Sequence, residues 1–202
     1  MRSPSSRTTT RTDARPVPRV VYRTAATLDG RIATPDHSLA WLFAVGSREE
    51  PDHAAFLQTV GALVMGASTF AWVVREEDLV AHPDRWPGYF GDRPTFVFAH
   101  RELDVPAGAD VRVVRGDVAA HAGAVRAAAG VRDVWLVGGG ELAGQFHDAG
   151  LLDEVQVTIA PATLGDGAPL LPRVIGPDRM DLVDVARHDR FAHLVYAVRP
   201  PG

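Results

Sequence analysis

The sequence contains no cysteine and no lysine, and each absence removes whole classes of chemistry. Without cysteine the chain can form no disulfide, thiolate nucleophile, iron–sulfur cluster or zinc site with sulfur ligands. Without lysine it can offer neither a Schiff-base amine nor a P-loop lysine to a phosphate. All 21 residues counted as Lys or Arg are therefore arginine. Any catalysis has to rest on other side chains, on backbone groups or on a bound cofactor.

The sequence also lacks a long apolar run and an excess of positive charge. Its 202 residues are 46% hydrophobic and carry a net charge of −4, which fits one soluble globular domain. We therefore expect no membrane span and no nucleic-acid partner. Residues 1–18 are rich in Ser, Thr, Arg and Pro and lack the apolar segment of a signal peptide. We predict a disordered arm over 1–18, a single domain over 19–202 and a cytoplasmic protein.

The eight histidines are scattered along the chain. His188 and His193 come near each other across a predicted hairpin, but no acidic cluster accompanies them. A metal site normally gathers three or four such ligands. We therefore expect no metal ion.

Short apolar runs alternate with helical segments through most of the chain, a pattern typical of an α/β fold. Strands are expected near 20–28, 62–65, 95–99, 111–114, 134–137 and 155–160. Helices are expected near 51–60, after Gly66-Ala67-Ser68-Thr69, near 118–129 and from the triple glycine through about 149. Residues 34–50 and 78–93 are predicted to be loops. Residues 181–187 and 192–198 predict a terminal hairpin. The whole pattern predicts a mostly parallel mixed sheet with a C-terminal antiparallel hairpin.

The strongest functional signal is a triple glycine between a predicted strand and a predicted helix, Gly138-Gly139-Gly140, followed by Glu141 and Leu142. Glycine lets the backbone approach a ligand closely, and free N–H groups at a helix start attract phosphate. With Ala143, these residues also fit the dinucleotide pattern G-x-G-x-x-A. A tight strand–helix joint with no ligand is the equally weighted alternative.

A second joint of the same kind follows the buried run Val64-Met65. Gly66 ends that run, and Ser68 and Thr69 lie near the start of the next helix. Either hydroxyl could be no more than a helix cap. Two such joints in one sheet could nevertheless bind both halves of the phosphate bridge of a dinucleotide.

These stretches together resemble the dihydrofolate reductase fold, a three-layer α/β architecture. They are more similar still to the C-terminal reductase domain of bacterial riboflavin-biosynthesis deaminase-reductases. The resemblance covers about residues 19–199, and its most specific part runs from Gly138 through Pro172. The run Thr27-Leu28-Asp29-Gly30 matches the family's first-strand motif, and Met65-Gly66 with Thr69 matches its Met-Gly-Arg-x-Thr element.

The resemblance implies an NADPH-dependent oxidoreductase, with NADH as an open alternative, and a homodimer. It places Gly66, Ser68 and Thr69 on the cofactor phosphates, and Gly138 through Leu142 along the pyrophosphate and nicotinamide. It places Ala25 and Ile32 beside the nicotinamide and Arg101 near the 2′-phosphate. Ala67 stands where the family carries arginine, which leaves the preference for NADPH over NADH undecided.

The resemblance also suggests a substrate pocket. Asp52 matches the position of the folate enzyme's substrate carboxylate, and Phe56 lies four residues further on. Asp52 is the candidate catalytic acid, with a helix-dipole contact as its alternative role. Trp41 and Thr158 fall on folate-pocket positions. Trp41 and Phe56 could equally be core residues.

The sequence thus favours a reductase that transfers a hydride from NAD(P)H to a small heterocyclic, carbonyl or imine substrate. Such chemistry needs no protein nucleophile, because the protein only orients the reactants and excludes water. Three alternatives remain open: a riboflavin-pathway 5-amino-6-(5-phosphoribosylamino)uracil reductase, a non-catalytic nucleotide-binding protein, and a plain Rossmann dehydrogenase. A terminal antiparallel hairpin would exclude the last of these.

Overall fold

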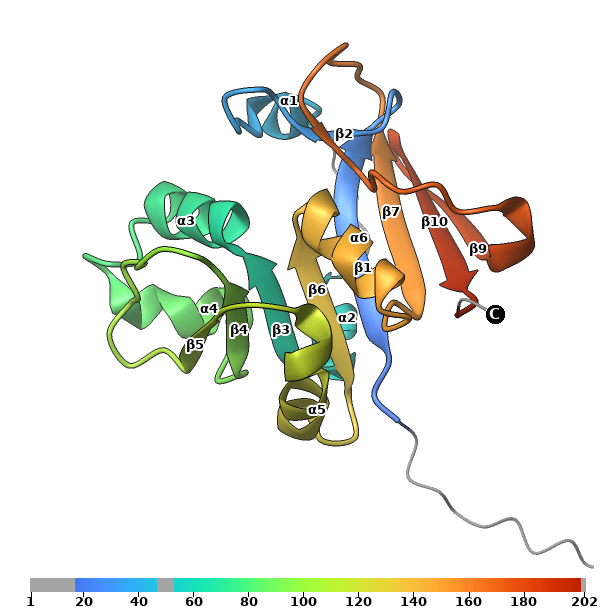
Figure 1. Ribbon diagram of the computed structural model, residues 1–202. Coiled ribbons are helices and arrows are strands. Elements are labelled where there is room, and N and C mark those ends of the chain that lie inside the picture. Colours follow the sequence, from blue (N-terminus) through green and yellow to red (C-terminus); the bar gives the residue numbers. More distant parts are fainter. Residues whose placement is uncertain (1–16, 47–52, 201–202) are drawn as a thin grey trace, which may run out of the picture.

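The fold is built on one eight-stranded sheet, seen in the computed structural model, which describes residues 17–46 and 53–200 (Figure 1). The strands are β1 Val20–Thr27, β3 Val60–Gly66, β4 Thr95–Phe98, β5 Val111–Val114, β6 Asp133–Gly138, β7 Glu154–Ala160, β9 Met180–His188 and β10 Phe191–Val198. Their order is β5-β4-β3-β6-β1-β7-β10-β9. Only β10 runs antiparallel to its neighbours β7 and β9, and the other pairings are parallel.

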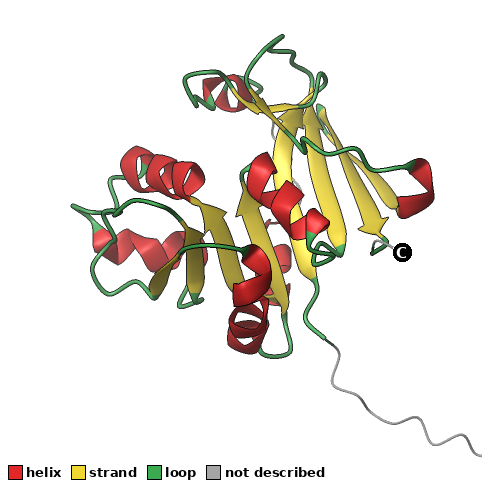
Figure 2. Cartoon of the chain, in the orientation of Figure 1, coloured by secondary structure: helices red, strands yellow, loops and turns green. Residues whose placement is uncertain are grey.

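Helices cover both faces of this sheet and complete three layers (Figure 2). They are α1 Ala40–Phe43, α2 His53–Thr59, α3 Ala67–Glu76, α4 Trp86–Phe90, α5 Val118–Ala129 and α6 Gly140–Asp148, with 3-10 turns at Pro83–Arg85 and Pro177–Arg179. One core packs α5 and α6 against residues such as Tyr22 and Val64. The opposite core packs α2, α3 and α4 against residues such as Leu63 and Met65. Alternate residues of each buried strand therefore serve opposite cores.

The predicted mostly parallel sheet with a C-terminal antiparallel hairpin is confirmed. Residues 118–129 form α5 as expected, because Asp117 caps its first turn through a 2.9 Å bond from the Ala119 amide to Oδ1. Gly130 ends the helix with a φ of 70°. The antiparallel hairpin also excludes the plain Rossmann alternative.

Two loop predictions were wrong in part. Residues 34–50 include the short helix α1, and residues 78–93 include a 3-10 turn and α4. Proline misled the second prediction, because Pro83 and Pro87 each lie in a first helical turn, where no N–H is needed. The two-stranded pair of β2 Arg31–Ala33 and β8 Ala168–Pro169 was not predicted, since strands this short carry no periodic signal.

The small β2–β8 pair and α1 lie beyond the ends of β1 and β7, at the top of Figure 1. Asp29 fixes this region, because its carboxylate accepts hydrogen bonds from the amides of Leu164 and Gly165. In the described ranges, no helix has both the length and the apolar character needed to cross a bilayer.

Replacing Tyr22 tests how the segment after β8 is held on the sheet. Tyr22 is fully buried, and its hydroxyl donates a 2.9 Å hydrogen bond to the Leu170 carbonyl. Tyr22→Phe leaves that carbonyl unpaired, so we expect the free energy of unfolding to fall by about 1–2 kcal/mol. Urea unfolding with an unchanged m-value measures this loss. Tyr196→Phe is the control, because the Tyr196 hydroxyl has no hydrogen bond within the described ranges, and an equal loss in both variants would contradict the assignment.

Candidate functional site

A cleft of about 710 Å³ runs along the ends of four parallel strands. Strands β3, β4, β5 and β6 all finish at it, since Gly66, Phe98, Val114 and Gly138 line its wall. The carboxyl ends of parallel strands meet at one edge of a sheet, and α/β proteins place their ligands at that edge.

Nine of the residues predicted to contact a cofactor line this one cleft. They are Ile32, Gly66, Ser68, Thr69, Gly138, Gly139, Gly140, Glu141 and Leu142. They come from three separate parts of the chain, the β2 strand, the β3–α3 joint and the β6–α6 joint. The structure thus brings them together, while their contact with a cofactor stays a prediction.

Both joints leave helix amides without side-chain partners. Gly66 is the N-cap of α3 and Gly139 is the N-cap of α6, and neither helix has a side-chain hydrogen bond to its cap. The first amides of a helix are unpaired within the helix and carry partial positive charge, so they attract an anion. Two helix starts on one cleft fit a diphosphate bridge.

The space around the glycine turn is tight at Gly140 and less crowded at Gly139. A Cβ on Gly140 would lie 2.2 Å from the carbonyl oxygen of Pro169, so only glycine fits there. A Cβ on Gly139 would meet nothing closer than 3.9 Å, at Ile32 Cδ1. The Gly138–Gly139 peptide is cis. Gly139 also lines the cleft, so its backbone can be approached from the cleft side.

Two basic residues that the sequence analysis missed line the far end of the cleft. Arg115 follows β5 and His100 follows β4. Within the described ranges the Arg115 guanidinium has no hydrogen bond or ion pair. Arg101, the sequence-based candidate for the 2′-phosphate, is exposed and does not belong to the lining. The signal that could have found Arg115 is its place directly after a predicted parallel strand.

The other end of the cleft is formed by Arg23, Thr24 and Trp135. The guanidinium carbon of Arg23 lies 4.2 Å from the centroid of the Phe56 ring, a cation–π contact. Phe56 also meets Trp135 edge to face at 5.4 Å between ring centroids. Phe56 is buried beneath these residues, so it supports the wall without lining it.

Besides Arg101 and Phe56, four predicted residues lie away from this cleft or outside the described ranges. Ala25 is on β1 but not in the lining, and Trp41 packs on a small cluster with Val45 and Phe191. Thr158, on β7, makes a 3.0 Å hydrogen bond with Nδ1 of His193. Asp52, the candidate catalytic acid, falls outside the residues that the structure describes.

His193 gives the protein a pH-dependent stability. His193 is buried, with 8% of the residue exposed. Burial lowers its pKa, with further lowering by the charges of Arg23 and His188 against a weaker opposing effect of Asp184. Because the folded pKa is below the unfolded value of about 6.5, the unfolded chain takes up the proton first as the pH falls. Stability is then lost below about pH 6.5 until the folded pKa is passed.

We expect His193→Gln to reduce the slope of the unfolding free energy against pH, below about pH 6.5, by up to about 1.4 kcal/mol per pH unit. Glutamine retains a polar group for Thr158 but does not titrate. Urea unfolding of both proteins between neutral and mildly acidic pH measures the slopes. Equal slopes would show that His193 does not cause the loss.

The comparison with protein families gives one match that covers most of the chain. The model of the RibD C-terminal domain matches residues 18–190. Among curated proteins, the uncharacterized protein YwjB of Bacillus subtilis (strain 168) is 25% identical over 178 residues, which are 88% of this chain and 97% of YwjB.

Solved structures carry the same fold. A protein from Shewanella sp. PV-4 with a provisional assignment to riboflavin biosynthesis has a TM-score of 0.69 and 26% identity, covering 90% of this chain and 99% of that one. The Thermotoga maritima diaminohydroxyphosphoribosylaminopyrimidine deaminase/5-amino-6-(5-phosphoribosylamino)uracil reductase has a TM-score of 0.59 and 19% identity over 91% of this chain. This chain spans 57% of the Thermotoga protein. These likenesses confirm the dihydrofolate-reductase-like fold expected from the sequence.

Proposed function

The chain belongs to the RibD C-terminal domain family, and from this premise we propose that it is an NAD(P)H-dependent reductase. The substrate would be a small heterocycle, carbonyl or imine that accepts a hydride. The observation that carries the proposal is the convergence of two glycine-capped helix starts on one cleft. Each helix start can bind one phosphate of a diphosphate without the help of lysine.

Three groups of lining residues would bind the diphosphate, the adenosine end and the nicotinamide of a reduced dinucleotide. Ser68 and Thr69 and the α3 amides would bind one phosphate, and the Gly139–Glu141 turn the other. Arg115 and His100 would surround the adenosine end, with Arg115 as the group for a 2′-phosphate. The nicotinamide supplies the hydride when bound. Ile32, Thr24 and Trp135 would hold the reacting end and exclude water from it.

A narrower candidate is the reduction of a phosphoribosylaminopyrimidine. Arg23 favours it, because this guanidinium places a positive charge at the end of the cleft opposite Arg115. A ribose phosphate on the substrate would be attracted to that end. The reductase half of the Thermotoga protein is named for such a substrate.

Calorimetric titration with NADPH and NADH tests the proposal. We expect a micromolar dissociation constant for at least one of them, about −8 kcal/mol. No binding of either up to about millimolar, roughly −4 kcal/mol, would overturn the cofactor assignment. Oxidation of bound cofactor on addition of 5-amino-6-(5-phosphoribosylamino)uracil would establish the narrower activity. Binding without oxidation by any carbonyl, imine or pyrimidine acceptor would instead favour a nucleotide-binding protein without catalysis.

A further inference from the structure

An acidic residue stands in the cleft at the place proposed for a diphosphate. Glu141 is in the first turn of α6 and lines the cleft beside Gly139 and Gly140. Its side chain is 64% exposed. A free carboxylate there would use the positive end of the helix for itself and would repel a phosphate. The site needs some means of offsetting that charge.

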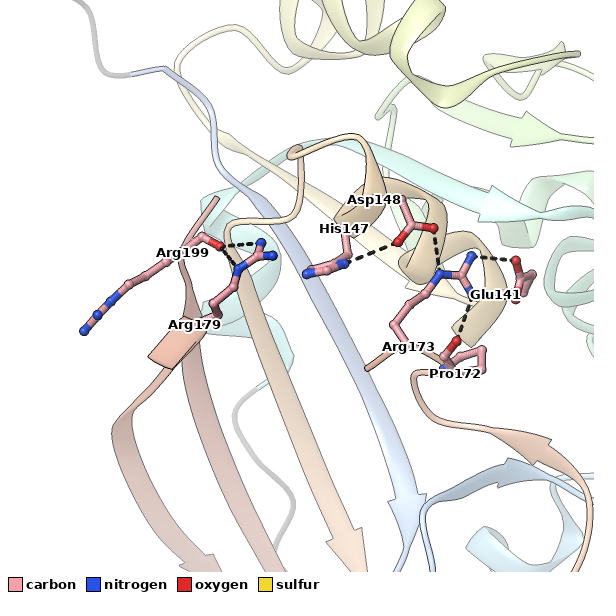
Figure 3. Close-up of polar contacts among 7 residues, drawn as sticks. All are labelled: Glu141, His147, Asp148, Pro172, Arg173, Arg179 and Arg199. Carbon is pink, nitrogen blue, oxygen red and sulfur yellow. Dashed lines mark hydrogen bonds and ion pairs between the residues drawn. The ribbon is translucent and has the colours of Figure 1, made fainter. Parts of the chain in front are cut away.

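Arg173 is the group that meets this carboxylate. Its Nη1 and Nη2 donate to the two carboxylate oxygens of Glu141 at 3.0 and 2.8 Å, a bidentate pair (Figure 3). Its Nε donates to Asp148 at 2.7 Å. Glu141 and Asp148 lie at opposite ends of α6, so one guanidinium spans the helix.

The sequence of α6 makes room for this arginine. A Cβ on Gly144 would lie 2.6 Å from the guanidinium carbon of Arg173. Arg173 therefore lies flat against the helix backbone at Gly144, and its side chain is only 22% exposed. The arginine also donates to the carbonyl of Pro172 at 2.8 Å, which fixes the turn from which it comes. This geometry holds the guanidinium in one place.

Arg173 lowers the pKa of each carboxylate that it binds. The bidentate pair with Arg173 lowers the pKa of Glu141, and the bond from Nε lowers the pKa of Asp148. Arg173 is the main cause of both shifts, and His147 adds a longer contact of 3.5 Å to Asp148. Glu141 lines the cleft, but Arg173 does not. The ion pair therefore holds the Glu141 carboxylate against a side chain that lies outside the cleft.

We propose that Arg173 is a positioning residue for anion binding: it neutralises and holds the Glu141 carboxylate, so that the amides of the glycine turn stay available to the diphosphate of a dinucleotide. This inference rests on the proposed function. It concerns a residue that touches neither substrate nor cofactor and acts through Glu141 alone.

Four variants separate a charge effect from a structural one. Arg173→Gln leaves the Glu141 carboxylate unpaired beside the glycine turn, whereas Glu141→Gln removes that carboxylate and leaves Arg173 paired with Asp148. The double variant carries neither charge beside the glycine turn and has the net charge of wild type. We expect Arg173→Gln to weaken NADPH binding about tenfold at low salt, Glu141→Gln to strengthen it a few-fold, and the double variant to return within about threefold of wild type. Asp148→Asn is the matched control, because an amide oxygen can still accept the bond from Arg173 Nε while the negative charge at the far end of α6 is lost. We expect its NADPH binding to stay within about threefold of wild type.

The measurement is titration with NADPH at low and at high salt, with thermal unfolding of each variant as the check on folding. The Arg173→Gln defect should shrink at high salt, because ions screen the exposed Glu141 charge. A double variant that binds as weakly as Arg173→Gln would overturn the proposal in favour of a structural role for the arginine. Unaltered binding by Arg173→Gln would overturn it directly. Failure of wild-type protein to bind either dinucleotide would overturn the proposed function, and this inference with it.

Discussion

Gly139→Asp is expected to weaken dinucleotide binding at least about a hundredfold, or roughly 2.7 kcal/mol, while the protein stays as stable as wild type. Gly139 has φ −87° and is the N-cap of α6, a position where aspartate is among the preferred residues. The new side chain fits, since its Cβ would meet nothing closer than 3.9 Å. Its carboxylate would accept hydrogen bonds from the α6 amides that a diphosphate needs.

The variant therefore removes binding through two effects, occupation of the amides and repulsion of the phosphate. Gly139→Asn separates them, because asparagine caps a helix about as well but carries no charge. We expect Asn to weaken binding about tenfold and Asp at least about tenfold more. Calorimetry measures the affinities, and thermal unfolding checks that both variants are as stable as wild type. Wild-type affinity in Gly139→Asp would mean that the diphosphate does not bind at this turn.

The sequence predicted the parts of the site that depend on local signals. Gly66 and Gly139 each end a buried run and begin a helix, so both joints could be placed before the fold was known. That they face one cleft depends on β3 and β6 being neighbours in the sheet. The resemblance to a known family supplied this arrangement, which spacing alone could not.

Long-range geometry explains what the sequence analysis missed. Arg173 meets Glu141 across 32 positions, and nothing in the segment after β8 indicates that its arginine will lie against Gly144. The short helices are likewise held by tertiary packing. In α4, Trp86 and Phe90 are buried in the core that also contains Phe70. In α1, Trp41 packs against the small cluster that contains Phe191. Elements of four or five residues have too little intrinsic helix stability to be predicted from propensity.

The family resemblance and the lining of the cleft assign the 2′-phosphate to different residues, Arg101 and Arg115. The family resemblance selects Arg101 for the 2′-phosphate, because of its position after β4. The structure favours Arg115, which lines the cleft, whereas Arg101 is exposed and outside the lining. Strand β5 is the edge of the sheet, and it brings Arg115 alongside the end of β4.

We expect Arg115→Gln to weaken NADPH binding about 10- to 100-fold, about 1.4–2.7 kcal/mol, and to leave NADH binding within about twofold. The 2′-phosphate is the only group that distinguishes the two dinucleotides, so the ratio of their dissociation constants isolates its contact. Arg101→Gln is the matched control and should leave that ratio unchanged. Loss of NADPH preference in Arg101→Gln but not in Arg115→Gln would instead support the family-based assignment. If wild type shows no preference for NADPH, neither arginine contacts a 2′-phosphate, and Ala67 would then mark a site that no longer distinguishes the two cofactors.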